Sequence, residues 1–413
     1  MSLDVTAVRA RFPSLASGIA YFDGPGGTQT PASVGEAIAR TITAPLSNRG
    51  TITAGERNAE DSVSDFRAAF ADLLGTVPEG VVHGRSATQL TYDFSRTLAT
   101  TWRAGDEVVV SQLDHDCNVR PWVRAAERAG VTLRWLRLDP VRAELDLDDL
   151  DEVVNERTRL VAVAAASNLL GSKPPVARIA ERAHAVGALV YVDGVHYAAH
   201  AAVDPAALGA DFFVCSPYKF FGPHCGVLAA DPALLATLHP DKLAPSTNDV
   251  PERFELGTLP YEILAGATAA VEFIAGIAAL RRPGGLDRLD RPTVTGGGRR
   301  ERILAAHHLI DEHELRLRRR IEDGLAGFGD RVIVHSRARD RTPTLFLTFA
   351  DRDSADAYGF LAERDVAAPA GTFYAYEPAR ALGVTSGLRI GLAPYNDDAE
   401  IDRLLDAIGE FLG

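Results

Sequence analysis

Short apolar runs alternate with amphipathic stretches between residues 80 and 230. The apolar runs cover residues 81–84, 107–111, 131–136, 160–166, 188–193 and 211–216. Stretches between them carry apolar residues at helical spacing and end near glycine, as in 119–130 and 175–188. Strands that are buried on both faces and alternate with helices predict an α/β fold with a doubly wound, mainly parallel sheet. In such a sheet the ligand binds beyond the carboxyl ends of the strands.

The pattern changes after the apolar helical segment 264–280. Residues 281–302 are rich in Gly, Pro and charge, which is typical of a surface crossing, and the run TGGGRRER within them lacks the Gly-Lys-Ser/Thr ending of a phosphate loop. Beyond them we expect a small α+β domain with helices at 301–326, 353–363 and from Ala399, and strands near 331–336, 343–349 and 387–393. The predicted organisation is an N-terminal segment 1–20 that joins the small domain, a large domain 21–282 and a small domain 283–413.

Composition narrows the function further. The formal net charge of −13 and the pI of about 5.3 argue against a general nucleic-acid surface or an anionic membrane partner. The residues MSLDVTAVRARFPSL have no apolar run after their basic residues, so we expect no signal peptide, and no apolar run is long enough to predict a membrane span. The three cysteines, Cys117, Cys215 and Cys225, are too few for a disulfide framework and suit a reducing compartment. We therefore expect a cytoplasmic protein.

Two residues at neighbouring strand ends carry the first chemical signal. Asp193 ends the run ALVYVD, and Lys219 follows DFFVCSPY. Taken singly, a strand-end Asp is usually a turn cap and a lone Lys is usually solvated. Together at the mouth of a parallel sheet, they suggest pyridoxal 5'-phosphate, for which a Lys forms a Schiff base and a carboxylate holds the pyridine nitrogen protonated.

The segments around these residues resemble the class V aminotransferase and cysteine desulfurase family of fold-type I pyridoxal-phosphate enzymes, in particular its cysteine desulfurase and selenocysteine lyase branch. Beside YVDGVHYAAH and VCSPYKFFGPHCGVL, further blocks match in the family's order: YFDGPGGTQTP, GRSATQ, QLDHDCNVRPW, SNLLGS, RFELGT and LRIGLAPYN. An ordered set over most of the chain is a strong signal. The resemblance implies a large domain with a seven-stranded type of sheet, a small C-terminal domain and a homodimer with shared active sites.

Catalytic roles carry over by motif. The resemblance implies that Lys219 is the Schiff-base lysine, that Asp193 partners the pyridine nitrogen and that His115 stacks on the cofactor ring. An imidazole at position 115 can also move a proton near neutrality. The neighbouring run Asp114 to Cys117 invites a metal site, yet consecutive side chains diverge and no second ligand cluster is visible, so we expect no metal.

Cofactor-binding roles carry over in the same way. GRSAT opens a predicted helix, so the amides of Arg85 and Ser86 and the Ser86 hydroxyl are natural phosphate ligands, which is compatible with an ordinary helix cap. The resemblance implies a second phosphate hydroxyl from Ser216 and a phosphate contact from Thr258 of the neighbouring subunit. Asn168 is expected near the cofactor's phenolic oxygen or the substrate amino group, although an ordinary turn role is as plausible.

The resemblance also implies three residues that bind the substrate, and one more that contacts the cofactor. Arg389 corresponds to the arginine that receives the substrate α-carboxylate, a role that suits a planar guanidinium, although a strand arginine in a salt bridge is the alternative. Gly26 and Gly27 are expected to line the substrate pocket. His196 stands where the family usually has a Gln on the cofactor oxygen, and reading it with His200 as a metal pair lacks a third ligand.

One departure limits how much of the family's activity carries over. Desulfurases that form a persulfide have a nucleophilic Cys in a mobile loop shortly before the carboxylate arginine, and here residues 366–387 contain none. Only a thiolate has the nucleophilicity to accept sulfur in this way. We therefore expect an enzyme that cleaves a carbon–sulfur or carbon–selenium bond of an amino acid without persulfide transfer.

Other functions remain open at this point. An aminotransferase acting on a small amino acid or amino-acid derivative fits the same residues, as does racemisation. A non-catalytic partner protein with this fold is a further alternative, against which the intact Lys219, Asp193 and Arg389 argue. A nicotinamide-dependent oxidoreductase would need a G-x-G-x-x-G turn between a strand and a helix, and the run GPGG at 24–27 does not meet that requirement.

Overall fold

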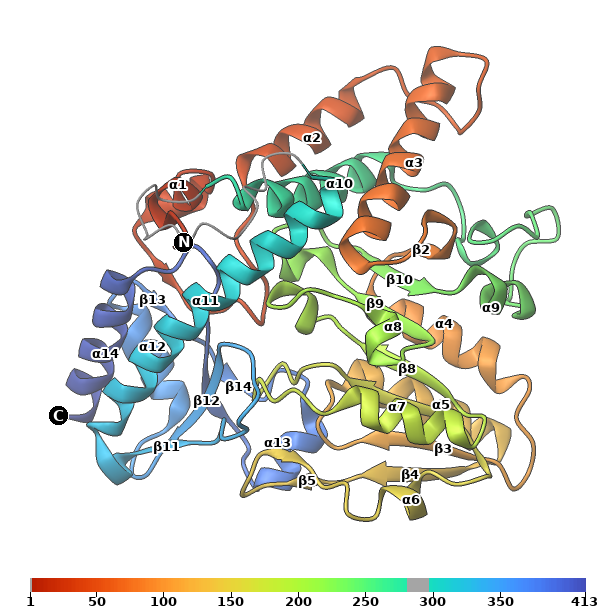
Figure 1. Cartoon of the computed structure of the whole chain (residues 1–413). Coiled ribbons are helices and arrows are strands. Elements are labelled where there is room, and N and C mark those ends of the chain that lie inside the picture. The colour runs from red at the N-terminus through yellow and green to blue at the C-terminus, as the bar shows by residue number, and fades with distance from the viewer. Residues whose placement is uncertain (1, 281–296) are drawn as a thin grey trace.

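A large mixed sheet forms the centre of the molecule (Figure 1). The computed structural model describes residues 2–280 and 297–413, so the predicted boundary near 282 lies outside the described residues. In sheet order the strands are β2 (Val81–Gly84), β10 (Gly226–Ala230), β9 (Phe212–Cys215), β8 (Leu189–Asp193), β7 (Thr158–Ala164), β3 (Glu107–Ser111) and β4 (Thr132–Leu136). Only β10 runs antiparallel to its neighbours. The prediction of a mainly parallel seven-stranded sheet is therefore confirmed.

Alternate residues of each strand enter different cores, because successive side chains point to opposite faces of a sheet. In β9, Phe212 and Val214 pack with α4 (Ala87–Ala99) and α5 (Arg120–Ala129). Phe213 and Cys215 belong to the core on the other face. That core also holds residues of α3 (Ala54–Leu74), α7 (Val176–Ala185) and α10 (Tyr261–Ile277). Both faces are covered, which explains the uninterrupted apolar runs in the sequence.

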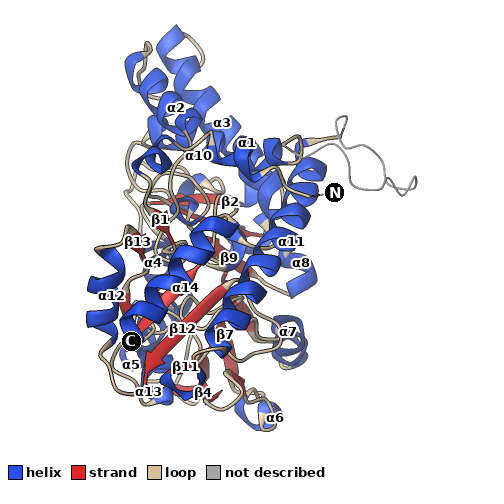
Figure 2. Ribbon diagram, turned by 90° about the vertical axis from the view of Figure 1, so that its left-hand side faces the viewer, coloured by secondary structure: helices blue, strands red, loops and turns tan. Residues whose placement is uncertain are grey.

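A second unit contains the C-terminal part of the chain. Its antiparallel sheet has the order β11 (Val332–Val334), β12 (Thr344–Phe349), β15 (Gly387–Gly391) and β14 (Ala370–Gly371). Residues of α12 (Ser354–Ala362), α14 (Asp398–Leu412) and the carboxyl half of α11 (Arg299–Ala326) share an apolar core with this sheet. Figure 2 shows α12 and α14 beside β12. We propose that this unit is the small α+β domain.

Shorter elements complete the fold. They are α1 (Val5–Arg9), β1 (Ala20–Tyr21), α2 (Ala32–Thr43), β5 (Leu138–Asp139), β6 (Glu144–Leu145), α6 (Leu150–Val153), α8 (Pro205–Leu208), α9 (Pro232–Thr237), β13 (Val366–Ala367) and α13 (Tyr376–Leu382). In the described parts of the chain, no helix combines the length and the apolarity needed to cross a membrane.

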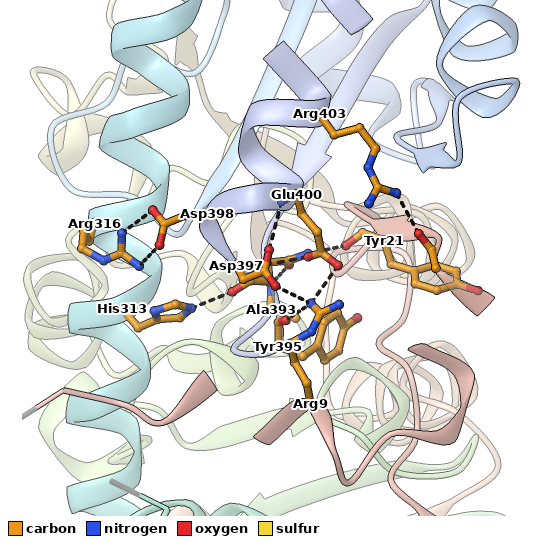
Figure 3. Close-up of polar contacts among 12 residues, drawn as sticks. Arg9, Tyr21, His313, Arg316, Ala393, Tyr395, Asp397, Asp398, Glu400 and Arg403 are labelled. Carbon is orange, nitrogen blue, oxygen red and sulfur yellow. Dashed lines mark hydrogen bonds and ion pairs between the residues drawn. The ribbon is translucent and has the colours of Figure 1, made fainter. Parts of the chain in front are cut away.

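The N-terminal segment contacts both units. Val8 and Phe12 lie in the core of the large sheet, whereas β1 pairs in parallel with β13 near the C-terminal sheet. Figure 3 shows that Arg9 reaches across to the start of α14, where its guanidinium donates to the Tyr395 carbonyl at 2.6 Å and to Glu400 at 2.8 Å. Glu400 is almost fully buried, so this ion pair fixes the segment more firmly than an exposed pair would.

Gly194 offers a test of the packing directly behind Asp193. A Cβ at this position would overlap the ring of Phe213, which is fully buried in β9 and has no room to move. Because inserted atoms in a filled core typically cost about 1–3 kcal/mol, we expect Gly194→Ala to lower the midpoint of thermal unfolding by about 1–3 °C in a chain of this length. Gly276→Ala in α10 is the matched control, since nothing lies within 4 Å of its Cβ position and alanine favours a helix. Equal midpoints for the two variants would contradict this account.

Candidate active site

One cavity gathers the polar residues that follow the parallel strands. It brings together seven of the residues that the sequence singles out: Ser86, His115, Asn168, Asp193, His196, Ser216 and Lys219. Their positions follow from topology, because β3, β7, β8 and β9 run in one direction and end at the same edge of the sheet. The cavity wall also includes Cys117 and Tyr218, which stand in the motifs around His115 and Lys219. Five further lining residues were not singled out in the sequence: Ala87, Thr88, Ala164, Ala166 and Val195.

The amine of Lys219 is buried in this cavity. Lys219 ends a short turn, Pro217–Lys219, directly after β9, and only 8% of its surface is exposed. Its Nζ donates to the Pro25 carbonyl and lies 4.7 Å from the centre of the Tyr218 ring. Burial, helped by the positive charge of Arg389, lowers the pKa of Lys219 to about 8. A substantial fraction of the amine is therefore unprotonated, and nucleophilic, in the neutral to mildly alkaline range.

The carboxylate of Asp193 is fixed from two sides. Its Oδ1 accepts the Val195 amide at 2.9 Å, and its Oδ2 accepts the thiol of Cys117 at 3.4 Å. Burial raises the pKa of Asp193 above its ordinary value, although these two donors and the charge of Lys219 oppose that rise. The side chain therefore has one defined orientation at the mouth of the sheet.

His115 is held as a neutral imidazole. Its Nδ1 accepts the Cys117 amide at 3.1 Å, which leaves the ring proton on Nε2. Burial, together with the charge of Lys219, lowers the pKa of His115 to about 4. Its ring centre lies 5.6 Å from that of Tyr374, so the imidazole is bounded by an aromatic on the side of the 366–387 segment.

Helix α4 begins at the cavity and offers backbone donors there. The Ser86 hydroxyl accepts the Gln89 amide at 3.1 Å, which is an N-cap. The Arg85 amide, which the sequence suggested as a phosphate ligand, instead donates to the Gln89 side chain at 3.0 Å. In its place the structure offers the first-turn amides of Ala87 and Thr88, which line the cavity and have no acceptor among the described residues. A helix start with free amides is suited to an anion.

Two polar atoms in the cavity wall have no partner within the described chain. The Nε2 of His196 lies 2.9 Å from the Thr342 hydroxyl and 3.0 Å from that of Thr344, whereas its Nδ1 is buried and unpaired. Asn168 donates to the Phe373 carbonyl at 2.9 Å, and its Oδ1 is buried and unpaired. Burial lowers the pKa of His196 well below its ordinary value, so the imidazole is neutral. Buried unpaired polar atoms on two residues that line one cavity indicate a ligand with matching groups.

Arg389 forms a salt bridge with Asp23, as in the alternative reading of a strand arginine. Only 2% of its surface is exposed, and its Nη2 lies 2.8 Å from Oδ1 of Asp23. Its Nη1 donates to the Asn168 carbonyl at 3.2 Å, and the Phe373 ring covers the guanidinium at 3.6 Å. The Nε remains without a partner in the described chain. Arg389 thus contacts Asn168, a residue of the cavity wall, and its Nε–H remains available as a donor.

The glycine loop brings Asp23 to Arg389. A Cβ on Gly26 would overlap both carboxylate oxygens of Asp23, so a larger residue would push this carboxylate away. Gly27 has a φ of +157° and packs against the Tyr218 ring. Neither glycine lines the cavity itself, but the loop that contains them covers it through the contact between Pro25 and Lys219.

Thr258 lies outside the cavity of its own chain. Its side chain is exposed, and the segment before it is anchored by Arg67, which contacts Glu252 and Glu255, each at 2.8 Å. Burial raises the pKa of Glu255, even though Arg67 opposes that rise.

All three cysteines have surroundings that favour the protonated thiol over the thiolate. Cys215 and Cys225 are buried, and Cys117 is partly exposed at the cavity wall. Burial raises the pKa of Cys225 to about 12 and raises the pKa values of Cys117 and Cys215 well above the ordinary value. None of the three is therefore a thiolate at neutral pH. In the described chain, no group of three metal-ligating side chains is present either.

Comparisons with known proteins agree with this architecture. The family model for aminotransferase class-V matches residues 20–282 and 304–404. A cysteine desulfurase from Dickeya dadantii is 30% identical over 97% of this chain and 95% of its own length, and an uncharacterized protein from Mycobacterium tuberculosis is 29% identical over 99% of both. The crystal structure of a cysteine desulfurase from Escherichia coli superposes with a TM-score of 0.84 at 26% identity, covering 99% of this chain and 98% of that one. The chain therefore belongs to the aminotransferase class-V family and is a pyridoxal 5'-phosphate-dependent enzyme.

Proposed function

We propose that this enzyme cleaves the carbon–sulfur, or carbon–selenium, bond of a small amino acid by β-elimination, without passing the sulfur to a cysteine of its own. With cysteine as substrate, the reaction converts cysteine and water to pyruvate, ammonia and hydrogen sulfide. The observation that carries this proposal is the placement of the three cysteines: none lies in the segment 366–387, Cys215 and Cys225 pack in the large core, and the Cys117 thiol is hydrogen-bonded to Asp193. Sulfur acceptance as a persulfide requires a thiolate, which none of them provides at neutral pH.

The residues of the cavity fit pyridoxal phosphate. The unpaired amides of Ala87 and Thr88 at the start of α4, with Ser86 and Ser216 nearby, suit a phosphate group. The unpaired Nδ1 of His196 and Oδ1 of Asn168 suit the polar oxygen of the ring. Lys219 and Asp193 lie in the same cavity wall, one able to bind an aldehyde carbon and the other a protonated ring nitrogen.

When bound, pyridoxal phosphate supplies an electron sink that stabilises negative charge at the substrate α-carbon. Lys219 would hold the cofactor through its Nζ, and the same amine, once free, would take the α-proton of the substrate. Asp193 Oδ2 would hold the proton of the ring nitrogen. His115 would limit movement of the cofactor ring; its Nδ1 already accepts the Cys117 amide, so Nε2–H is the donor that remains for the site. Departure of the β-substituent as sulfide then completes the cleavage.

The substrate carboxylate binds Arg389 in this proposal. The unpaired Nε and the remaining protons on Nη1 and Nη2 provide the donor edge, while Asp23, Asn168 and Phe373 hold the guanidinium in place. A preformed position reduces the entropy that the substrate loses on binding. Gly26 has a supporting role, because it leaves room for the Asp23 carboxylate.

We extend the proposal to a homodimer that shares its active sites. Thr258 is exposed and outside its own cavity, which is consistent with a phosphate contact in the partner's site. The ion pairs of Arg67 with Glu252 and Glu255 hold this segment in a fixed position on the surface. Free thiols throughout the chain suit the reducing conditions of the cytoplasm, which is the location we propose.

Product analysis tests the reaction. Incubated with cysteine, the holoenzyme should release sulfide, pyruvate and ammonia in equal amounts, with no persulfide on the protein by mass spectrometry. Lys219→Ala should show no turnover. Alanine as the product, with sulfur bound to the enzyme, would contradict the proposal in favour of desulfuration through a persulfide. Formation of a new amino acid from an added keto acid, without sulfide, would instead identify an aminotransferase.

The pKa of Lys219 predicts how cofactor attachment depends on pH. Because the unprotonated amine is the nucleophile, the rate at which apoenzyme binds pyridoxal phosphate covalently should rise about tenfold per pH unit and level off above about pH 8. Stopped-flow absorbance measures this rate. In Arg389→Met the positive neighbour is lost, the pKa of Lys219 rises and the plateau moves to higher pH. A wild-type plateau reached only above pH 10 would show that Lys219 is not perturbed.

Mixed dimers test the sharing of sites. Thr258→Val and Lys219→Ala homodimers should both be weakly active or inactive. A heterodimer of the two contains one site with Lys219 from one subunit and Thr258 from the other, so mixing should recover up to half of the wild-type activity per heterodimer. The control mixes wild-type and Lys219→Ala chains, which retain activity without complementation. No recovery from the first mixture, with heterodimers verified by mass, would reject a shared site.

A further inference from the structure

Cys117 is the one cysteine of this chain that lies in the wall of the cavity. It is part of the short turn Asp116–Asn118, which follows β3 and precedes α5. Its Sγ lies 3.4 Å from Oδ2 of Asp193, within hydrogen-bond distance for sulfur. Cys215 and Cys225 pack among apolar residues of the large core instead.

The turn holds this thiol in place. The Cys117 amide donates to Nδ1 of His115 at 3.1 Å. The next residue, Asn118, donates to Oδ1 of the buried Asp114 at 2.6 Å and accepts the indole N–H of Trp122 at 3.1 Å. All these groups except Cys117 and His115 are completely buried. The distance between the thiol and Asp193 is therefore set by a rigid hydrogen-bonded turn rather than by a flexible side chain.

The thiol is the donor in its contact with Asp193. Burial raises the pKa of Cys117 well above its ordinary value, and the negative charges of Asp193 and Asp114 raise it further. A protonated thiol donates to a carboxylate and, being a poor nucleophile, does not accept sulfur. The cysteine that is nearest to the cofactor pocket is thus suited to holding a carboxylate rather than to sulfur transfer.

The two oxygens of Asp193 are not equivalent. Oδ1 accepts the amide of Val195 at 2.9 Å, whereas Oδ2 has the Cys117 thiol as its donor. We propose that Cys117 is a positioning residue, which orients Asp193 so that Oδ2 meets the ring nitrogen of the cofactor and which weakens the basicity of that oxygen through its thiol hydrogen bond. This inference rests on the proposed role of Asp193.

Removal of the Cys117 thiol should affect the absorbance of the cofactor and kcat more strongly than it affects KM for the amino acid. In the Cys117→Ala holoenzyme we expect the pH midpoint of the visible cofactor band to shift by several tenths of a unit. We expect kcat to fall about 3- to 10-fold with KM for the amino acid changed less than about twofold, because a hydrogen bond to a carboxylate is lost far from the substrate carboxylate site. Cys117→Ser keeps a donor and should restore both values to within about twofold of wild type.

Cys225→Ala is the matched control, since it also removes a buried thiol but lies outside the cavity wall, and it should leave the band and kcat unchanged. The inference is overturned if Cys117→Ala matches wild type in band and kcat, or if Cys117→Ser is as impaired as Cys117→Ala. Asp193→Asn separates this failure from that of the proposed function. Weakened cofactor binding in Asp193→Asn beside a silent Cys117→Ala rejects the positioning role alone, whereas a silent Asp193→Asn rejects the role assigned to Asp193 itself.

Discussion

The site depends on one constraint, which is burial. At one edge of the large sheet, an amine, a carboxylate and two imidazoles are removed from water. Burial lowers the pKa values of Lys219, His115 and His196 and raises that of Asp193, so every shift favours the neutral form of the group. Leaving a buried polar atom unpaired typically costs about 1–3 kcal/mol. The unpaired atoms of His196 and Asn168 therefore lower the free energy of unfolding, and the packing of the rest of the fold has to offset this cost. A bound cofactor with complementary groups offsets that cost, which couples cofactor binding to the stability of the fold.

The same constraint explains why distant parts of the chain are fastened to this edge. Arg389 comes from β15 of the C-terminal sheet, yet its charge reaches Lys219 and is balanced by Asp23 from the amino-terminal loop. Thr344, the first residue of β12, and Thr342, which precedes the strand, hold the ring of His196. Movement of the C-terminal unit would therefore change the surroundings of Lys219 and His196 together. With Arg389 in its proposed role, binding of a substrate carboxylate there would be linked to the protonation state of Lys219 through this arrangement.

Much of this architecture is visible in the sequence, because the features that define it are local. Strand ends place Asp193 and Lys219 at one edge, and the six apolar runs predict six of the seven strands within two residues; the antiparallel strand β10 is the one they miss. What the sequence could not give depends on contacts between distant residues. The Arg85 amide is taken by a side chain four residues later, and the salt bridge between Asp23 and Arg389 joins residues 366 positions apart. Ala87 and Thr88 were missed for another reason: free amides at a helix start have no side-chain signature, although the first turn after an N-cap Ser was a signal that could have found them.

The segment 366–387 contains no cysteine and is held in place by contacts with both sides of the site. Phe373 and Tyr374 both have φ values near +55°, a strained region for residues with side chains. Their carbonyls accept from Asn168 and from the Asp116 amide, and the Phe373 ring lies on the guanidinium of Arg389. A loop that must carry a persulfide to an outside acceptor needs freedom to move, whereas these contacts fasten the segment to both walls of the site. Under the proposed elimination, sulfur released behind such a wall would leave as a small diffusing molecule rather than on a protein cysteine.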